Sequence, residues 1–150
     1  MRDTLHYLLM ADHMMFQKAL LTEIKDTGLT SGQPKVLDYL RNHDGAVQKE
    51  IASACKIEPA TLTSLLAGME NKNLIVRKML DGNRRSLYVY LTENGKELAE
   101  RVAIEFSEIE TDVLLGFTDQ EKETLITLLK KVNKNITNMN HEGDVTNDKD

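Results

Sequence analysis

The sequence predicts a mainly α-helical protein with one small β-hairpin. Through most of the chain, apolar residues recur at steps of three and four, which is the period of an amphipathic helix. Between positions 74 and 91, two β-branched or aromatic runs instead flank the turn sequence Asp81-Gly82-Asn83, a pattern typical of two strands joined in a hairpin. With 150 residues, the chain has the length of a single domain, because a core of that size is normally self-sufficient.

The composition is that of an ordinary globular protein, with 41% hydrophobic and 29% charged residues. No apolar run approaches the ~20 residues of a membrane helix, and the N-terminus lacks the apolar run and cleavage pattern of a signal peptide. The single cysteine, Cys55, cannot form an internal disulfide, which agrees with a reducing compartment. We therefore expect a cytoplasmic protein that does not enter a membrane.

Two helices are expected in the first part of the chain. The first covers 4–27 and is closed by Gly28, since glycine commonly ends helices. The sequence from Thr30 to Gln33 matches a capping box, in which Thr30 is the expected N-cap and the Gln33 side chain reaches back to it. The second helix then runs to about Asn42.

A helix-turn-helix followed by a hairpin is expected next. A short helix over 47–54 leads into a tight connector, and Pro59 suits the first position of another helix, 59–72. The inward face of that helix consists of Leu62, Leu65, Leu66 and Met69. The strands of the hairpin cover 74–79 and 86–91. Because the hairpin directly follows the helix-turn-helix, we expect it to form a wing beside it.

Two helices and a tail complete the prediction. Thr92 caps a long helix that ends near Gly116. A second capping box, from Thr118 to Glu121, opens the last helix. The final residues, 139–150, are acidic and poor in bulky apolar groups, so we expect them to be disordered.

Three stretches of the sequence are the most distinctive: LTSGQPKVLDYL at 29–40, EPATLTSLLAGMENKNLIVRK at 58–78 and DGNRRSLYVYLTENG at 81–95. In these stretches the sequence is similar to the MarR (multiple antibiotic resistance regulator) family of winged helix-turn-helix transcription factors. The resemblance, over roughly 5–138, implies a winged helix-turn-helix DNA-binding region at 30–92, flanked by dimerisation helices at 4–28 and 93–138. It also implies a homodimer on a pseudo-palindromic double-stranded operator and, as in many members, release by a small aromatic or phenolic ligand.

The resemblance places the helix over 59–72 in the major groove. On a helical wheel its outward face consists of small residues, which allow close approach to the bases but offer little discrimination through paired hydrogen bonds. Sequence choice is therefore expected to depend partly on groove shape, with phosphate contacts that position the protein. The candidate DNA-binding residues of the helix-turn-helix are Lys49, Lys56, Ala60, Thr61, Thr63, Ser64, Ala67 and Asn71.

The turn of the hairpin supplies the other candidate DNA contacts, Arg84 and Arg85. A narrow minor groove attracts arginine side chains, and the tip of a hairpin can deliver one. The family motif matches Arg85 to its characteristic arginine, but Asn83 stands where the family usually has an aspartate. Asp81 is the remaining carboxylate that could support the arginine. Alternatively, either arginine pairs with Asp81 in a solvated turn.

Charge is distributed unevenly along the chain, whose net charge is −5. Positions 46–91 hold seven Lys or Arg and four acids, a net charge of +3, so the remainder of the chain carries −8. A basic island on an acidic body fits the electrostatic footprint of a phosphate backbone.

A cleft for the implied ligand is expected near the methionine-rich first helix, since methionine and aromatic side chains form adaptable walls. The candidates are Met10, His13, Met14, Phe16, Tyr39 and His43. More often, a stripe of such side chains is simply the core of a dimer, which is the alternative interpretation. The four histidines lack metal-ligand spacing, and no phosphate loop, nucleophile elbow or Cys–His pair indicates an enzyme. We expect no metal, no cofactor and no catalysis.

The sequence thus favours a homodimeric, sequence-specific regulator of transcription, most simply a repressor. The alternative is a dimeric winged-helix module that binds a protein instead of DNA. Two features favour it: the outward face of the helix over 59–72 consists of small side chains, and the net charge of the chain is negative. Cys55 is most simply a small buried hydrophobe, and a thiol sensor is the third hypothesis.

Overall fold

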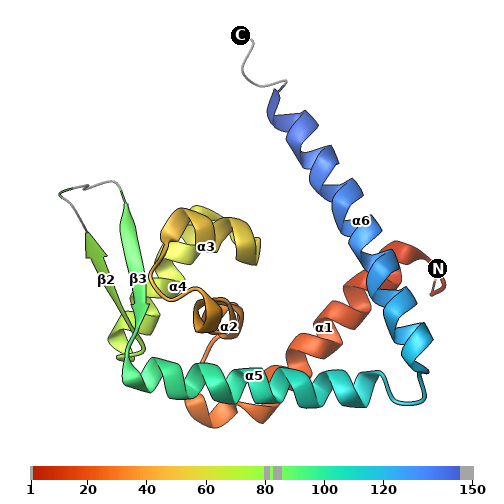
Figure 1. Ribbon diagram of the computed structural model, residues 1–150, viewed down its shortest axis with the longest axis horizontal. Coiled ribbons are helices and arrows are strands. Elements are labelled where there is room, and N and C mark those ends of the chain that lie inside the picture. The colour runs from red at the N-terminus through yellow and green to blue at the C-terminus, as the bar shows by residue number, and fades with distance from the viewer. Residues whose placement is uncertain (1, 80–81, 83–85, 146–150) are drawn as a thin grey trace. The chain divides into compact units, whose positions relative to one another are not determined.

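The structure, a computed structural model, describes residues 2–79, 82 and 86–145 (Figure 1). Its elements are α1 (Leu5–Glu23), η1 (Lys25–Thr27), α2 (Gln33–Asn42), β1 (Ala46–Val47), α3 (Gln48–Cys55), α4 (Pro59–Asn71), β2 (Ile75–Met79), β3 (Leu87–Leu91), α5 (Glu93–Val113) and α6 (Asp119–Val145). The chain forms two compact units, one up to Glu110 and one from Thr111. The predicted fold class, mainly helical with a β-hairpin, is confirmed.

The hairpin belongs to a three-stranded antiparallel sheet with the strand order β1-β3-β2. Val89 in the central strand pairs with Ala46 of β1 and with Arg77 of β2. The Asp44 carboxylate accepts a hydrogen bond from Leu91 N–H at 2.8 Å, which fixes the loop before β1 to the sheet. Strand β1 has no signal in the sequence, because two residues are too few to display an alternating pattern.

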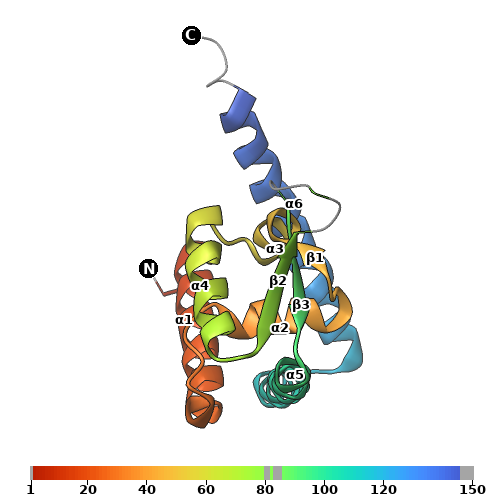
Figure 2. The ribbon, with the colours of Figure 1, turned by 90° about the vertical axis from the view of Figure 1, so that its left-hand side faces the viewer.

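Helices α2, α3 and α4 build the core of the first unit together with this sheet. α3 packs against α2 and α4, and α4 leads into β2 (Figure 1, Figure 2). The side chains buried most completely in this core, including one from the end of α1 and one from α5, are Ile24, Val36, Leu37, Leu40, Ile51, Leu62, Leu66, Met69, Ile75, Val89 and Val102. Each contributes about 1.5–3 kcal/mol by leaving water, and most of that sum is offset by lost chain entropy. The inward face of α4 agrees with the prediction, except that Leu65 is only half-buried.

The first helix ends earlier than the sequence predicts. α1 stops at Glu23, and the last turn of the helix expected over 4–27 is instead the 3-10 turn η1, which Gly28 closes with a left-handed φ of 72°. The Thr27 hydroxyl donates a hydrogen bond to Ile24 O within this turn. Such local side-chain bonds compete with the α-helical ladder, which explains the change of helix type.

The second helix begins later than predicted, and Thr30 is not its N-cap. Gly32, with a φ of 91°, takes that position, and α2 starts at Gln33 with Pro34 in its first turn. One half of the capping box does form, because Gln33 Oε1 accepts a hydrogen bond from Thr30 N–H at 3.1 Å. Proline favours the first turn of a helix, so the residues after Thr30 determine where the helix begins.

Both later caps form as predicted. Thr92 Oγ1 accepts a hydrogen bond from Gly95 N–H at 3.0 Å at the start of α5. At the start of α6, Thr118 and Glu121 each bond to the other's backbone N–H at 3.1 Å, which is a complete capping box. Each pair satisfies N–H groups that have no partner inside the helix.

The last helix is longer than the sequence predicts. α6 continues to Val145 and so enters the stretch 139–150, for which disorder is expected. No proline interrupts that stretch and it contains one glycine, Gly143, whose intrinsic penalty in a helix is about 1 kcal/mol. An established helix adds one hydrogen bond per residue and can therefore continue through polar residues. Residues 146–150 lie outside the described part of the chain.

An ion pair ties α5 to the turn after α1. Arg101 Nη1 and Nη2 each lie 2.7 Å from a carboxylate oxygen of Asp26, and Nη2 also donates to Glu23 O at 3.3 Å. The hydrogen bonds from Arg101 hold the pKa of Asp26 below its usual value of 3.8. Because both side chains are largely exposed, salt screens the pair.

We expect Asp26→Asn to lower the urea midpoint of unfolding at pH 7, and the difference from wild type to disappear in acid. The pKa of Asp26 is lower in the folded than in the unfolded chain, so the stabilisation is fully present above the unfolded value of about 3.8 and is lost as the pH falls through the folded pKa. Urea unfolding of both proteins at a series of pH values measures this. A difference that stays constant in acid would assign the loss to packing instead of the ion pair.

Candidate nucleic-acid interface

The turn between α3 and α4 depends on a residue with a left-handed backbone. Lys56, the C-cap of α3, has φ 54° and ψ 46°, which is uncommon for a residue other than glycine. Pro59 then occupies the first turn of α4. This turn lets α3 and α4 pack together with Ile51 and Leu62 buried. The opposite face of α4 is left exposed.

The exposed face of α4 carries the small and polar residues that the sequence predicts. Ala60, Thr61, Thr63, Ser64 and Asn71 are all exposed, and Ala67 is half-buried. The Thr63 hydroxyl donates to the backbone oxygen four residues earlier at 3.0 Å, and Ser64 does the same at 3.4 Å. Either hydroxyl has to leave this bond before it can donate to a phosphate oxygen.

Three of the five described cations in the basic stretch 46–91 are engaged within the protein. Lys72 donates to a backbone oxygen of the α1–α2 loop, Arg77 pairs with a glutamate of α4, and Lys78 Nζ lies 5.2 Å from the centroid of a tyrosine ring. Lys49 and Lys56 are exposed, as Lys72 and Lys78 also are, but neither makes a side-chain hydrogen bond or ion pair in the part of the chain that the structure describes. Among the described cations of this stretch, Lys49 and Lys56 are therefore the ones whose side chains are not already engaged by other groups of the protein.

Arg77 connects three elements of this surface. From β2, its Nε pairs with Glu70 of α4, and its Nη1 donates to Gln48 Oε1 of α3 at 3.4 Å. The Arg77 side chain is only 20% exposed, so solvent screens the pair less than it screens an open surface pair. The contact fixes the base of the hairpin to both helices. Sequence reasoning missed it, because its three residues are separated along the chain and match no short motif.

The predicted wing-tip residues lie outside the described part of the chain: Asp81, Asn83, Arg84 and Arg85. The strands that lead to this tip are described. Met79 at the end of β2 pairs with Leu87 at the start of β3, so the hairpin register is regular as far as the tip.

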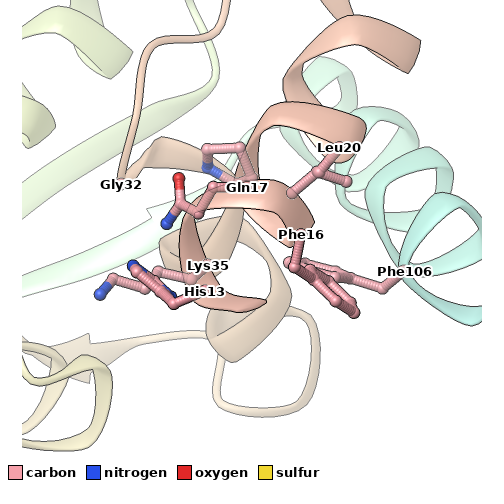
Figure 3. Close-up of a pocket in the computed structure, with 8 residues that line it drawn as sticks. His13, Phe16, Gln17, Leu20, Gly32, Lys35 and Phe106 are labelled. Atoms are coloured by element: carbon pink, nitrogen blue, oxygen red, sulfur yellow. The ribbon is translucent and has the colours of Figure 1, made fainter. Parts of the chain in front are cut away.

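A pocket of about 190 Å³ lies between α1, the start of α2 and α5 (Figure 3). Its lining consists of His13, Phe16, Gln17, Leu20, Gly32, Pro34, Lys35 and Phe106. Figure 3 shows the rings of Phe16 and Phe106 against each other, and their centroids are 6.2 Å apart. A mostly apolar lining with a few polar groups is the character of a small-molecule site, although drug-sized ligands occupy larger pockets of ~300 Å³ or more.

Two of the six cleft candidates from the sequence line this pocket, namely His13 and Phe16. Met10 and Met14 do not line it and are 67% and 70% exposed. Tyr39 and His43 are also absent from the lining and instead stack on each other, with ring centroids 4.2 Å apart. Sequence periodicity could not find Phe106, because this residue reaches the pocket from a distant helix.

Cys55 is a buried side chain of α3. Only 9% of it is exposed, and its Sγ donates to Lys35 O at 3.7 Å. Burial raises the pKa of the Cys55 thiol, so the thiol stays protonated at neutral pH. Because the thiolate is the reactive form, this environment favours the small buried hydrophobe over the thiol sensor.

Neither a membrane span nor a metal site is found in the part of the chain that the structure describes. None of its helices combines the length and the apolar character that crossing a bilayer requires. No group of three or more His, Cys, Asp or Glu side chains there is arranged to hold a metal ion.

Known sequences resemble this chain closely enough to define its class. Residues 29–87 match the MarR family. The chain is 33% identical over 115 residues to the uncharacterised HTH-type transcriptional regulator YybA of Bacillus subtilis (strain 168), and the match covers 76% of each protein. It is also 38% identical over 89 residues to the HTH-type transcriptional regulator PecS of Dickeya dadantii (strain 3937). That match covers 59% of this chain and 54% of PecS, so the chain spans only about half the length of this relative.

Solved structures agree with this class. A MarR family transcriptional regulator from Listeria monocytogenes, solved in complex with a 26mer DNA, has a TM-score of 0.83 and 26% identity, and the match covers 92% of this chain and 91% of that chain. The S. aureus MepR–DNA complex has a TM-score of 0.79 and 30% identity, over 89% of this chain and 98% of that one. The fold is therefore that of the winged helix-turn-helix regulators. The chain belongs to the MarR family.

Proposed function

We propose that this chain is a homodimeric, sequence-specific regulator of transcription that binds a pseudo-palindromic double-stranded DNA operator and acts as a repressor. The observation that carries the proposal is the exposed face of α4, whose small side chains leave room for close approach to a major groove. The relatives from Listeria monocytogenes and S. aureus were solved as DNA complexes, which supports the same partner here. Arg84 and Arg85 would enter the adjacent minor groove.

Exposed apolar side chains support the homodimer. On α1, Leu5, Met10, Met14 and Met15 are 60–70% exposed. The second unit also exposes large apolar groups, which among the described residues are Val113, Leu115, Phe117, Ile126, Leu128, Leu129, Ile136 and Met139. Apolar surface of this extent on a single chain is the ordinary sign of a protein interface. A two-fold dimer through 4–28 and 93–138 would set the two copies of α4 one helical turn of DNA apart, about 34 Å.

The pocket beside α1 supports release of DNA by a small aromatic or phenolic ligand. Phe16 and Phe106 would stack on an aromatic ring, and His13 and Lys35 would supply polar partners for its substituents. No cofactor or catalytic step is part of this proposal.

A second candidate function is a dimeric winged-helix module that binds a protein. The observation in its favour is that Lys72, Arg77 and Lys78 are engaged within the protein, while the whole chain carries a net charge of −5. DNA affinity relies on free cations that neutralise phosphates.

Selection from a random duplex library distinguishes the two functions. We expect the purified protein to recover an inverted repeat, and its affinity to fall ~10³- to 10⁵-fold between 50 and 200 mM salt if six to ten phosphates are contacted. Arg85→Ala should weaken binding, whereas Lys122→Ala, a change of the same charge on exposed α6, should not. Recovery of no sequence, with weak binding that Arg85→Ala leaves unchanged, would favour the protein-binding module.

A further inference from the structure

One polar side chain is buried in the otherwise apolar core of the described residues. Gln33, at the start of α2, is 3% exposed. Burying an amide without hydrogen-bond partners is unfavourable by several kcal/mol in an apolar medium, so such groups are almost always bonded. The partners of Gln33 therefore indicate what this position requires.

The Gln33 amide joins the α1–α2 loop to α4. Its Oε1 accepts hydrogen bonds from Thr30 N–H at 3.1 Å and from Lys72 Nζ at 2.9 Å, and its Nε2 donates to Leu65 O at 3.3 Å. Lys72 Nζ also donates to Gly28 O at 2.7 Å. The C-terminal end of α4 is thus attached to the loop, and the middle of α4 is attached to Gln33, the first residue of α2.

The loop and α4 approach each other too closely for intervening side chains. A Cβ on Gly68 of α4 would lie 3.0 Å from Gln33 Nε2. A Cβ on Gly32 would lie 2.9 Å from Leu65 Cδ1. Direct packing between close-packed elements transmits displacement, so the placement of α4 depends on how this loop holds it.

We propose that Gln33 and Lys72 are positioning residues for DNA recognition: they fix α4 against the α1–α2 loop, and Lys72 does not contact a phosphate. The inference rests on the DNA binding proposed above. Lys72 lies in the basic stretch 46–91 and directly follows α4. From this position in the sequence alone, one would expect it to contact a DNA phosphate. The structure instead directs its ammonium group toward two oxygens of the protein, Gly28 O and Gln33 Oε1.

The two roles of Lys72 predict different salt dependences. If Lys72 contacts a phosphate, its loss weakens binding to the operator and to unrelated DNA alike. It also reduces the magnitude of the slope of log affinity against log salt concentration by ~0.9. Loss of a positioning contact weakens operator binding alone, because only the operator complex requires α4 to match base edges and groove shape. The salt slope and the affinity for unrelated DNA then stay at the wild-type values.

The experiment measures the affinity of Gln33→Met, Lys72→Met and Lys49→Met for the selected operator and for unrelated duplex over a series of salt concentrations. Lys49, exposed on α3, serves as the comparison of equal charge. We expect Gln33→Met and Lys72→Met to lose about tenfold in operator affinity, as is typical of a lost hydrogen bond to a charged group, with an unchanged slope. Lys49→Met should lower the magnitude of the salt slope by ~0.9 and weaken binding to both the operator and the unrelated duplex.

Lys72→Met and one further variant, which combines Gln33→Met with Lys72→Met, distinguish a loss of positioning from a trivial loss of fold. Lys72→Met leaves Gln33 bonded to Thr30 and Leu65, so it should fold even where Gln33→Met does not. The double variant should lose less operator affinity than the two single losses combined, because Gln33 and Lys72 share one hydrogen bond. Two results for Lys72→Met would overturn the inference. One is a salt slope smaller in magnitude than that of wild type, and the other is a wild-type ratio of operator affinity to affinity for unrelated DNA. If wild type selects no operator, the proposed function fails instead.

Discussion

Replacing Gly95 with alanine is expected to destabilise the folded protein by about 3 kcal/mol or more, the upper range for overpacking a core. Gly95 is buried in the first turn of α5. A Cβ at this position would lie 2.0 Å from Leu74 O, a backbone atom that cannot rotate away. The same oxygen accepts a hydrogen bond from Thr92 N–H at 3.0 Å. Alanine would therefore push the first turn of α5 away from Leu74, the residue before β2, and break the bond between Thr92 and Leu74.

Urea unfolding followed by circular dichroism measures this loss. Asn94→Ala is the matched control, because Asn94 is the neighbouring residue in the same turn and is exposed. Exposed substitutions of this kind usually change stability by less than ~0.5 kcal/mol. Equal midpoints for Gly95→Ala and Asn94→Ala would show that α5 does not depend on the close approach to Leu74.

Features whose partners lie close in the sequence could be predicted. The capping box of α6 forms because Thr118 and Glu121 are three residues apart, the spacing at which each side chain reaches the other's N–H. The box at α2 forms only in half, since Gly32 and Pro34 between and after its partners move the helix start. Strand β1 could not be predicted, because it exists only through pairing with a strand more than forty residues later in the chain, as in Ala46 with Val89.

The candidate interface could likewise be predicted because it depends on residues close in the sequence, whereas the pocket depends on residues far apart in the sequence. The outward face of α4 follows from the period of one helix, so its exposed residues could be named from sequence. The pocket requires Phe16 of α1 to meet Phe106 of α5, which periodicity within either helix cannot reveal. Charge counts fail for a related reason. They assign Lys72 and Arg77 to a basic surface, whereas each bonds to protein oxygens that only the fold brings near.

Ser64→Glu is expected to reduce operator affinity by about 100-fold or more. Ser64 is exposed on the proposed reading face of α4, and a carboxylate there would oppose the DNA phosphates, where like-charge contacts at an interface oppose binding by several kcal/mol. Folding should be intact, since glutamate is a better helix former than serine.

Fluorescence anisotropy with the selected operator measures the loss, and circular dichroism checks the fold. Asn94→Glu adds the same charge at an exposed position outside α4 and the wing, so it should bind nearly as wild type does. If a folded Ser64→Glu protein bound the operator as tightly as Asn94→Glu, α4 would not read DNA through this face. A protein partner for the winged helix would then account better for its small, neutral surface.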